Sequence, residues 1–197
     1  MNILMTSLHR VAQAGLWFGG ALVLLAAFVI AVDVVLRRLF NVSIGGADEL
    51  AGYALAIGTA WGLGAALLDR AHIRIDSLYL LLPRGVRHLL DVLGVVLLVG
   101  FFLLVAWHGA GVVAQSWRSG SRSQSDLQTP TVVPQMLWLA GLVVLVVVGF
   151  VLLVRGLMLL ARGDHVAVAR AIGTRSAAEA IEAEVPALKE RAPKGGG

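Results

Sequence analysis

Four long stretches without a single Asp, Glu, Lys or Arg constrain this chain more than any other feature. They cover residues 11–32, 50–68, 92–117 and 127–154, although 14% of the whole chain is charged. Each is long enough to cross a bilayer, which takes about 20 apolar residues in a helix. Lipid offers no hydrogen-bond partners to the backbone, so such spans must be helical. The pattern therefore predicts an all-α membrane protein with four transmembrane helices and excludes a water-soluble globular domain.

The predicted spans extend slightly beyond the charge-free stretches, and they make up a four-helix membrane domain over residues 1–162. They cover about 11–36, 48–68, 89–116 and 132–160. The first is too long for the apolar region of a signal peptide, so we expect an uncleaved membrane helix. Residues 163–197 are rich in Ala and charge and are predicted to be a partly disordered cytoplasmic tail. The absence of Cys excludes a disulfide-stabilised secreted domain.

Arginines near the ends of the spans indicate the orientation. They are more numerous on the side that holds Arg10, the 69–91 loop and the start of the tail than on the other side. The positive-inside rule therefore places both termini in the cytoplasm of a bacterial inner membrane. Residues 77–82 are apolar but too short to span, so we expect a short amphipathic segment at the cytoplasmic interface. The net charge of +4 is thus explained by topology and does not indicate nucleic-acid binding.

Two ionisable residues lie within the predicted spans. Asp33 precedes Arg37 by four residues, on the same helix face. An interfacial ion pair is therefore favoured, and a proton relay is the alternative. His108 is expected to be a hydrogen-bonded residue near the interface, because no second histidine is placed to form an axial haem pair. We expect no cofactor.

Glycines recur four residues apart in the first two spans, at Gly15 and Gly19 and again at Gly58 and Gly62. This spacing favours close helix packing, either within the chain or against a partner. Motifs for nucleophilic catalysis, nucleotide binding or metal binding are missing from the sequence, so no enzyme activity is expected. The spans also lack the broken helices and polar midplane of a self-sufficient transporter. The residues alone predict a small membrane subunit that works with a larger partner.

Four motifs at the ends of the spans resemble one known family. They read Arg37-Arg38-Leu39-Phe40-Asn41, Gly46-Ala47-Asp48-Glu49-Leu50, His72-Ile73-Arg74-Ile75-Asp76 and Thr129-Pro130-Thr131-Val132-Val133-Pro134. Their order and spacing resemble the small membrane subunit, or Q-type small permease, of tripartite ATP-independent periplasmic (TRAP) transporters. The resemblance covers about residues 10–160 and does not include the tail.

The resemblance implies a scaffold role in the import of organic anions such as dicarboxylates or related carboxylates. A periplasmic binding protein would deliver the substrate, and a large elevator-type membrane subunit would move it. The small subunit would bind neither substrate nor metal. At the outer face, the candidate contacts with these partners are Arg37, Arg38, Asn41, Asp48 and Glu49. At the inner face, the candidate structural or subunit contacts are His72, Arg74 and Asp76. For both groups, local structural pairing, including helix capping by Asp48 and Glu49, is an equal alternative.

A second interpretation is a stand-alone four-helix membrane protein. It would be either a proton-linked carrier that uses Asp33 or the membrane anchor of a redox module. Co-purification with a much larger membrane subunit favours the first interpretation. Ion flux by the isolated chain, or haem absorbance, favours the second.

Overall fold

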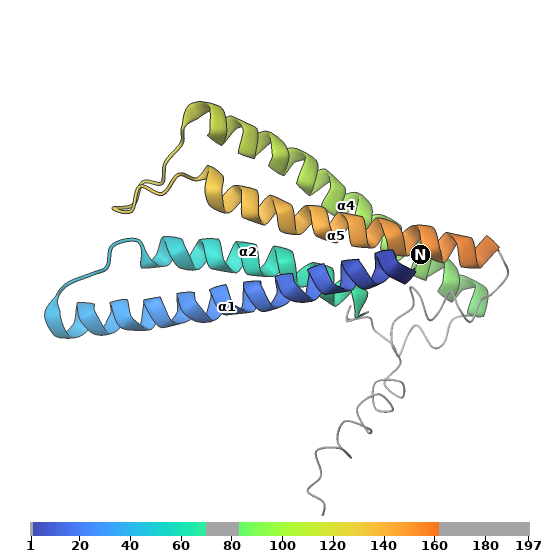
Figure 1. The fold of residues 1–197 in the computed structure, drawn as a ribbon, viewed down its shortest axis with the longest axis horizontal. Coiled ribbons are helices and arrows are strands. Elements are labelled where there is room, and N and C mark those ends of the chain that lie inside the picture. Colours follow the sequence, from blue (N-terminus) through green and yellow to red (C-terminus); the bar gives the residue numbers. More distant parts are fainter. Residues whose placement is uncertain (1, 70–82, 162–197) are drawn as a thin grey trace, which may run out of the picture. The chain divides into compact units, whose positions relative to one another are not determined.

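The computed structural model describes residues 2–69 and 83–161, and this part of the chain contains four α-helices (Figure 1). They are α1 (Asn2–Phe40), α2 (Ala47–Leu68), α4 (Arg84–Ser119) and α5 (Val132–Ala161). All four are long and apolar enough to cross a membrane, which confirms that part of the prediction. The predicted amphipathic segment at 77–82 and the tail at 163–197 lie outside the described residues.

Two of the helices are longer than the predicted spans by several residues, and the other two by one residue each. α1 begins at Asn2 and ends at Phe40, and α4 extends from Arg84 to Ser119. Hydropathy locates only the segment that can lie in lipid, whereas Arg, Gln and Leu also favour a helix outside that segment. The helices therefore continue past the apolar windows on both sides.

The helix ends have clear local causes. α1 is followed by Asn41 at φ 54°, and α4 is followed by Gly120 at φ 59°. Asn and Gly are the residues that most readily adopt this left-handed conformation after a helix. Ser121 N–H donates to the carbonyl of Ser116 at 3.2 Å, the bond that closes a Schellman motif. Pro134 lies in the first turn of α5, where the N–H that proline lacks would have no helical partner.

The chain divides into two compact units. The larger comprises Met1–Asp69 and Val96–Val151, and the smaller comprises Arg70–Val95 and Leu152–Gly197. In the smaller unit, the structure describes residues 83–95 and 152–161. Asp91, Val95 and Leu152 are buried there. Asp91 is a buried carboxylate that directly precedes the charge-free stretch 92–117 and was not among the predicted site residues.

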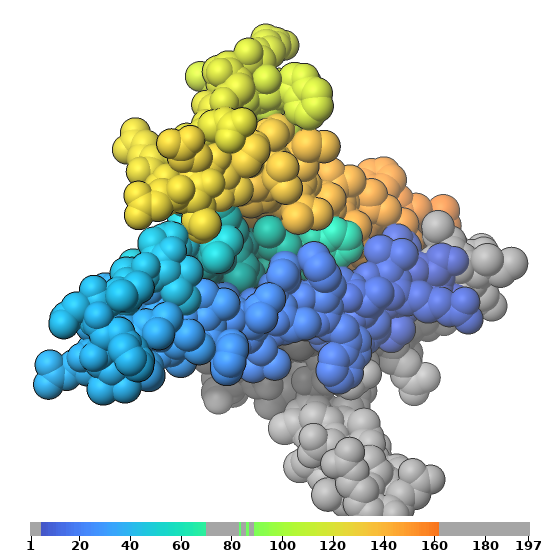
Figure 2. Space-filling model, turned by 60° about the vertical axis from the view of Figure 1, so that its left-hand side comes forward, coloured from blue at the N-terminus to red at the C-terminus, as the bar shows by residue number. Residues whose placement is uncertain are grey.

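In the larger unit, α1 and α2 pack through glycines. A Cβ atom at Gly19 would lie 2.8 Å from the Cα of Gly58, and one at Gly58 would lie 3.0 Å from the carbonyl oxygen of Gly19. Real Cβ atoms essentially never lie as close to backbone as 2.8 Å and seldom as close as 3.0 Å, so glycine at both positions permits this approach. The small-residue spacing noted in the sequence therefore serves packing within the chain at these two positions. Figure 2 shows α1 as a continuous outer strip, and only 11% of its apolar window is buried.

Trp61 of α2 connects three helices of the larger unit. Its ring lies against Gly15 of α1 and Gly141 of α5. Its indole N–H donates to the carbonyl oxygen of Leu137 in α5 at 3.0 Å. A buried core of Ala60, Ala106 and Leu142 lies beside it, where α2, α4 and α5 meet.

Candidate functional site

Most of the side-chain hydrogen bonds described in the larger unit gather at one end, which we call the loop end. It carries the 41–46 turn between α1 and α2 and the 120–131 loop between α4 and α5. Most of the residues that the sequence singled out for outer-face contacts lie in or beside this region. The loop end is therefore the candidate functional site.

Asp33 attaches the end of α1 to the 41–46 turn. The residue is 2% exposed, and one of its carboxylate oxygens accepts hydrogen bonds from Ser43 Oγ at 2.9 Å and from the Ile44 N–H at 2.7 Å. The other oxygen is bound by the guanidinium of Arg37, one helical turn later. The side chain of Arg37 is 60% exposed, so its charge stays accessible while it neutralises a buried acid. Both carboxylate oxygens of Asp33 are thus bound by residues of its own helix and the adjoining turn.

Two glycines bring the 41–46 turn against the 120–131 loop. Gly45 (φ 66°) and Gly46 (φ 98°) both have the left-handed backbone conformation that favours glycine. A Cβ atom at Gly45 would lie 2.7 Å from Asp126 Oδ2, and one at Gly46 would lie 2.5 Å from Leu127 Cδ1. The two loops therefore form one continuous platform at the loop end.

The 120–131 loop is held by its own hydrogen bonds. Ser123 N–H donates to the Thr129 carbonyl at 2.9 Å, and Thr131 N–H donates to the Ser121 carbonyl at 3.1 Å. Arg122 and Pro130 form an isolated antiparallel bridge between them. The sequence patterns of the spans do not predict this hairpin-like pairing.

Glu49, in the first turn of α2, is the second acid held at the loop end. One carboxylate oxygen accepts a hydrogen bond from Ser125 of the loop. The other, Oε1, is buried and has no hydrogen-bond partner among the described residues. Among the described residues, no Lys, Arg or His forms a salt bridge with Glu49. The N-cap residue of α2 is Gly46, which makes no side-chain capping hydrogen bond. Asp48 and Glu49 lie in the first turn of the helix and do not occupy the N-cap position.

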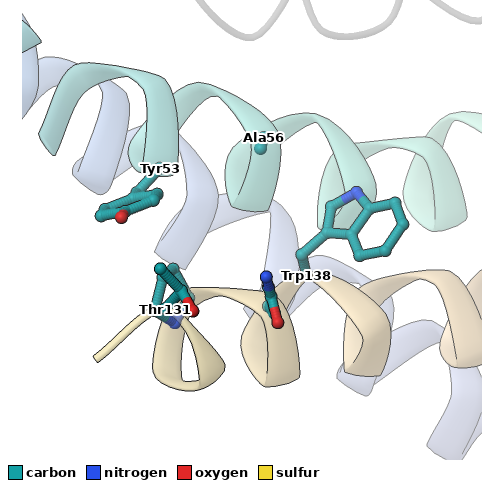
Figure 3. A pocket seen from close by; sticks show the side chains of 6 residues that line it. Tyr53, Ala56, Thr131 and Trp138 are labelled. Atoms are coloured by element: carbon teal, nitrogen blue, oxygen red, sulfur yellow. The ribbon is translucent and has the colours of Figure 1, made fainter. Parts of the chain in front are cut away.

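A pocket of about 200 Å³ lies between α2 and α5, and the first α2 residue in its lining, Tyr53, follows Glu49 by one helical turn. Figure 3 shows Tyr53 and Ala56 on α2 facing Thr131 and Trp138, with Tyr53 opposite Thr131. Pro134 and Gln135 complete the lining, which is mostly apolar. Oε1 of Gln135 is buried and has no hydrogen-bond partner among the described residues. Tyr53 follows Glu49 by one helical turn, so both lie on the same face of α2.

The other residues predicted as sites are distributed as follows. Arg38, Asn41 and Asp48 are exposed at the loop end, and Asn41 also terminates α1. His108 is exposed on α4 and has no hydrogen-bond partner in the described part of the chain. The expected inner-face residues His72, Arg74 and Asp76 lie outside the described residues.

Sequence reasoning missed Ser43, Ser125 and the pocket. Serine-rich loops are common, and nothing in the spacing shows which hydroxyl meets a carboxylate that is 76 residues away in the chain. The pocket arises from two helices that meet only in the folded protein. Within the described ranges, the side chains hold no cluster of three His, Cys, Asp or Glu that could bind a metal ion. What the loop end offers is charge, hydrogen-bonding groups and a shallow apolar cavity.

Comparison with known proteins identifies a family to which the chain is similar. A family model described as the DctQ component of tripartite ATP-independent periplasmic transporters matches residues 26–159. The match extends over more than half of the chain and includes α2 and α4 in full, most of α5, and the loop end of α1 with Asp33. No curated protein and no solved structure matches the chain.

Proposed function

The chain belongs to the DctQ-component family of tripartite ATP-independent periplasmic transporters, and we propose that it is the static scaffold of a transporter that imports organic anions. The family is a transporter component and not an enzyme family. The proposed substrates are dicarboxylates or related carboxylates. The proposed partners are a large elevator-type membrane subunit, which moves the substrate, and a periplasmic binding protein, which delivers it.

The observation that carries this proposal is the family match over the four apolar helices. Ionisable groups inside a membrane usually mark the path of a substrate or an ion. Helices with charge-free interiors therefore suit a static frame against which a mobile domain slides. Asp33 is the acid within the long apolar helix α1, and its contacts with Arg37, Ser43 and Ile44 support a structural role.

We further propose that the protein lies in the bacterial inner membrane with both termini in the cytoplasm. The loop end then faces the periplasm. Arg37, Arg38, Asn41 and Asp48 are exposed around it and are proposed to contact the binding protein. Charged groups on an open rim of this kind act mainly on the rate and specificity of docking.

Reconstitution of the three components into liposomes tests the proposal. Uptake of a radiolabelled dicarboxylate or related carboxylate is expected only when this chain, the large subunit and the binding protein are all present. Liposomes without this chain are the matched control. Haem absorbance of the purified chain, or ion flux by the chain alone, would instead favour the stand-alone carrier or redox anchor.

A further inference from the structure

Asp33, which is buried, and Glu49, which is half-buried, differ in one respect at the loop end. Asp33 is neutralised by Arg37 on its own helix. Glu49 has a hydrogen bond from Ser125 but no cation among the described residues, and its second oxygen has no partner there. A carboxylate at the boundary of an apolar helix is costly without a compensating charge. This difference suggests that the counter-charge of Glu49 comes from another molecule.

The pocket that begins at Tyr53, one helical turn after Glu49, has the size and lining for a single side chain. Its volume of about 200 Å³ is below the range of roughly 300–1,000 Å³ that is usual for small-molecule sites. Its walls are the apolar surfaces of Ala56, Pro134 and Trp138, and Gln135 contributes an acceptor oxygen without a described partner. Lys and Arg combine an apolar stem with a cationic head, and they place the stem along apolar surface while the head reaches a polar group.

We propose that a Lys or Arg side chain of the large membrane subunit occupies this pocket and forms an ion pair with Glu49. The stem would lie between Tyr53 and Trp138, and the head would bind the Glu49 carboxylate at the loop end. Gln135 has several rotatable bonds, and its amide would turn to accept a further hydrogen bond. This inference rests on the proposed function and adds which face of the chain, that of α2 and α5, meets the large subunit.

The surface of α2 fits a protein neighbour better than lipid. Among the four apolar windows, α2 has the lowest mean hydropathy, 1.4, whereas those of the others are 2.6 to 3.1. α1 and α4 expose large apolar side chains such as Leu24, Phe28, Leu97 and Phe101. By contrast, α2 exposes Gly52, Ala56 and Thr59 together with few large side chains. Small residues on a membrane helix permit close approach of another helix.

Photo-crosslinking in the assembled complex tests the position of the pocket. A photoreactive amino acid replaces Ala56, which is exposed and lines the pocket, and the matched control replaces Leu55, which is exposed but does not line it. We expect a crosslink from position 56 to a large-subunit peptide that contains Lys or Arg, and a much weaker one from position 55. Crosslinks from position 56 to lipid, to the binding protein or to a second copy of this chain would overturn the proposal.

Charge exchange tests the ion pair. Glu49→Gln retains an acceptor for Ser125, so the fold should persist, but dissociation of the large subunit should be faster by on the order of tenfold or more. Glu49→Lys should abolish the complex, and reversal of the crosslinked Lys or Arg to Glu should restore it. Asp48→Asn, at the exposed neighbouring acid that is proposed to face the binding protein, is the matched control and should leave the dissociation rate of the large subunit unchanged. Unchanged dissociation in Glu49→Gln would refute the inference, whereas failure of the wild-type chain to bind the large subunit would refute the proposed function itself.

Discussion

Asp33 accepts a hydrogen bond from the backbone N–H of Ile44 at 2.7 Å, eleven residues further along the chain. Through this bond and the one from Ser43, a side chain inside α1 determines where the 41–46 turn lies. The 41–46 turn itself contacts the 120–131 loop through Gly45 and Gly46. A buried acid thus organises the loop end through contacts within the chain.

Replacement of Asp33 separates a structural role from a proton-relay role. Asp33→Asn keeps an acceptor oxygen for Ile44 and Ser43 and loses only the charge that pairs with Arg37. We expect nearly normal uptake by the reconstituted transporter and a modest fall in thermal stability. Asp33→Ala should destabilise the chain more, because the Ile44 N–H then loses its acceptor. Abolished uptake in an Asp33→Asn complex that assembles normally would establish the proton relay instead.

The contact between α1 and α2 at Gly19 should not tolerate a side chain. Gly19→Ala places a methyl group 2.8 Å from the Cα of Gly58, so the helices must separate. We expect a loss of about 1–3 kcal/mol in the free energy of unfolding, measured by reversible denaturation in mixed micelles. Gly20→Ala is the control, because a Cβ there meets nothing within 4 Å. Equal stability of the two variants would show that this close approach is absent in the membrane.

The hydrogen bond from Trp61 to Leu137 should contribute measurably to the packing of α2 on α5. Trp61→Phe keeps most of the ring contact with Gly15 and Gly141 but removes the indole N–H. A single hydrogen bond of this kind contributes about 0.5–1.5 kcal/mol, so we expect a loss of that size in unfolding experiments. Trp107→Phe, at a tryptophan that is 76% exposed, should leave the unfolding free energy unchanged. A loss at position 107 as large as that at 61 would argue against the assigned contact.

Ser125 and Glu49 should behave as a coupled pair. Ser125→Ala removes the hydroxyl that donates to Glu49 and should lower the melting temperature of the purified chain. In a Glu49→Ala background the same substitution should have little further effect, because its acceptor is already gone. A double-mutant cycle measured by thermal unfolding reports this coupling directly. Strictly additive effects would mean that the loop and α2 are not joined by this bond.

The sequence alone determined the architecture of the membrane part. Charge-free stretches long enough to span a bilayer admit only helices, so four apolar helices followed from residue order. Asn41 and Gly120 at the helix ends are also local signals, and the spacing of Asp33 and Arg37 is sufficient to bring their side chains together on one helix face. The motifs at the ends of the spans were enough to indicate the transporter family.

Only the tertiary structure decided which polar groups meet. Ser125 and Glu49, or Tyr53 and Gln135, are brought together by the packing of α2 and α5 and by the folding of the 120–131 loop. Sequence periodicity says which face of a helix is apolar but not which helix covers it. The close approach of Gly19 to Gly58 was one of several packings that the glycine spacing permitted. Asp33 is paired with Arg37 within the larger unit, whereas Glu49 has no cation among the described residues. This difference appears only once the fold is known.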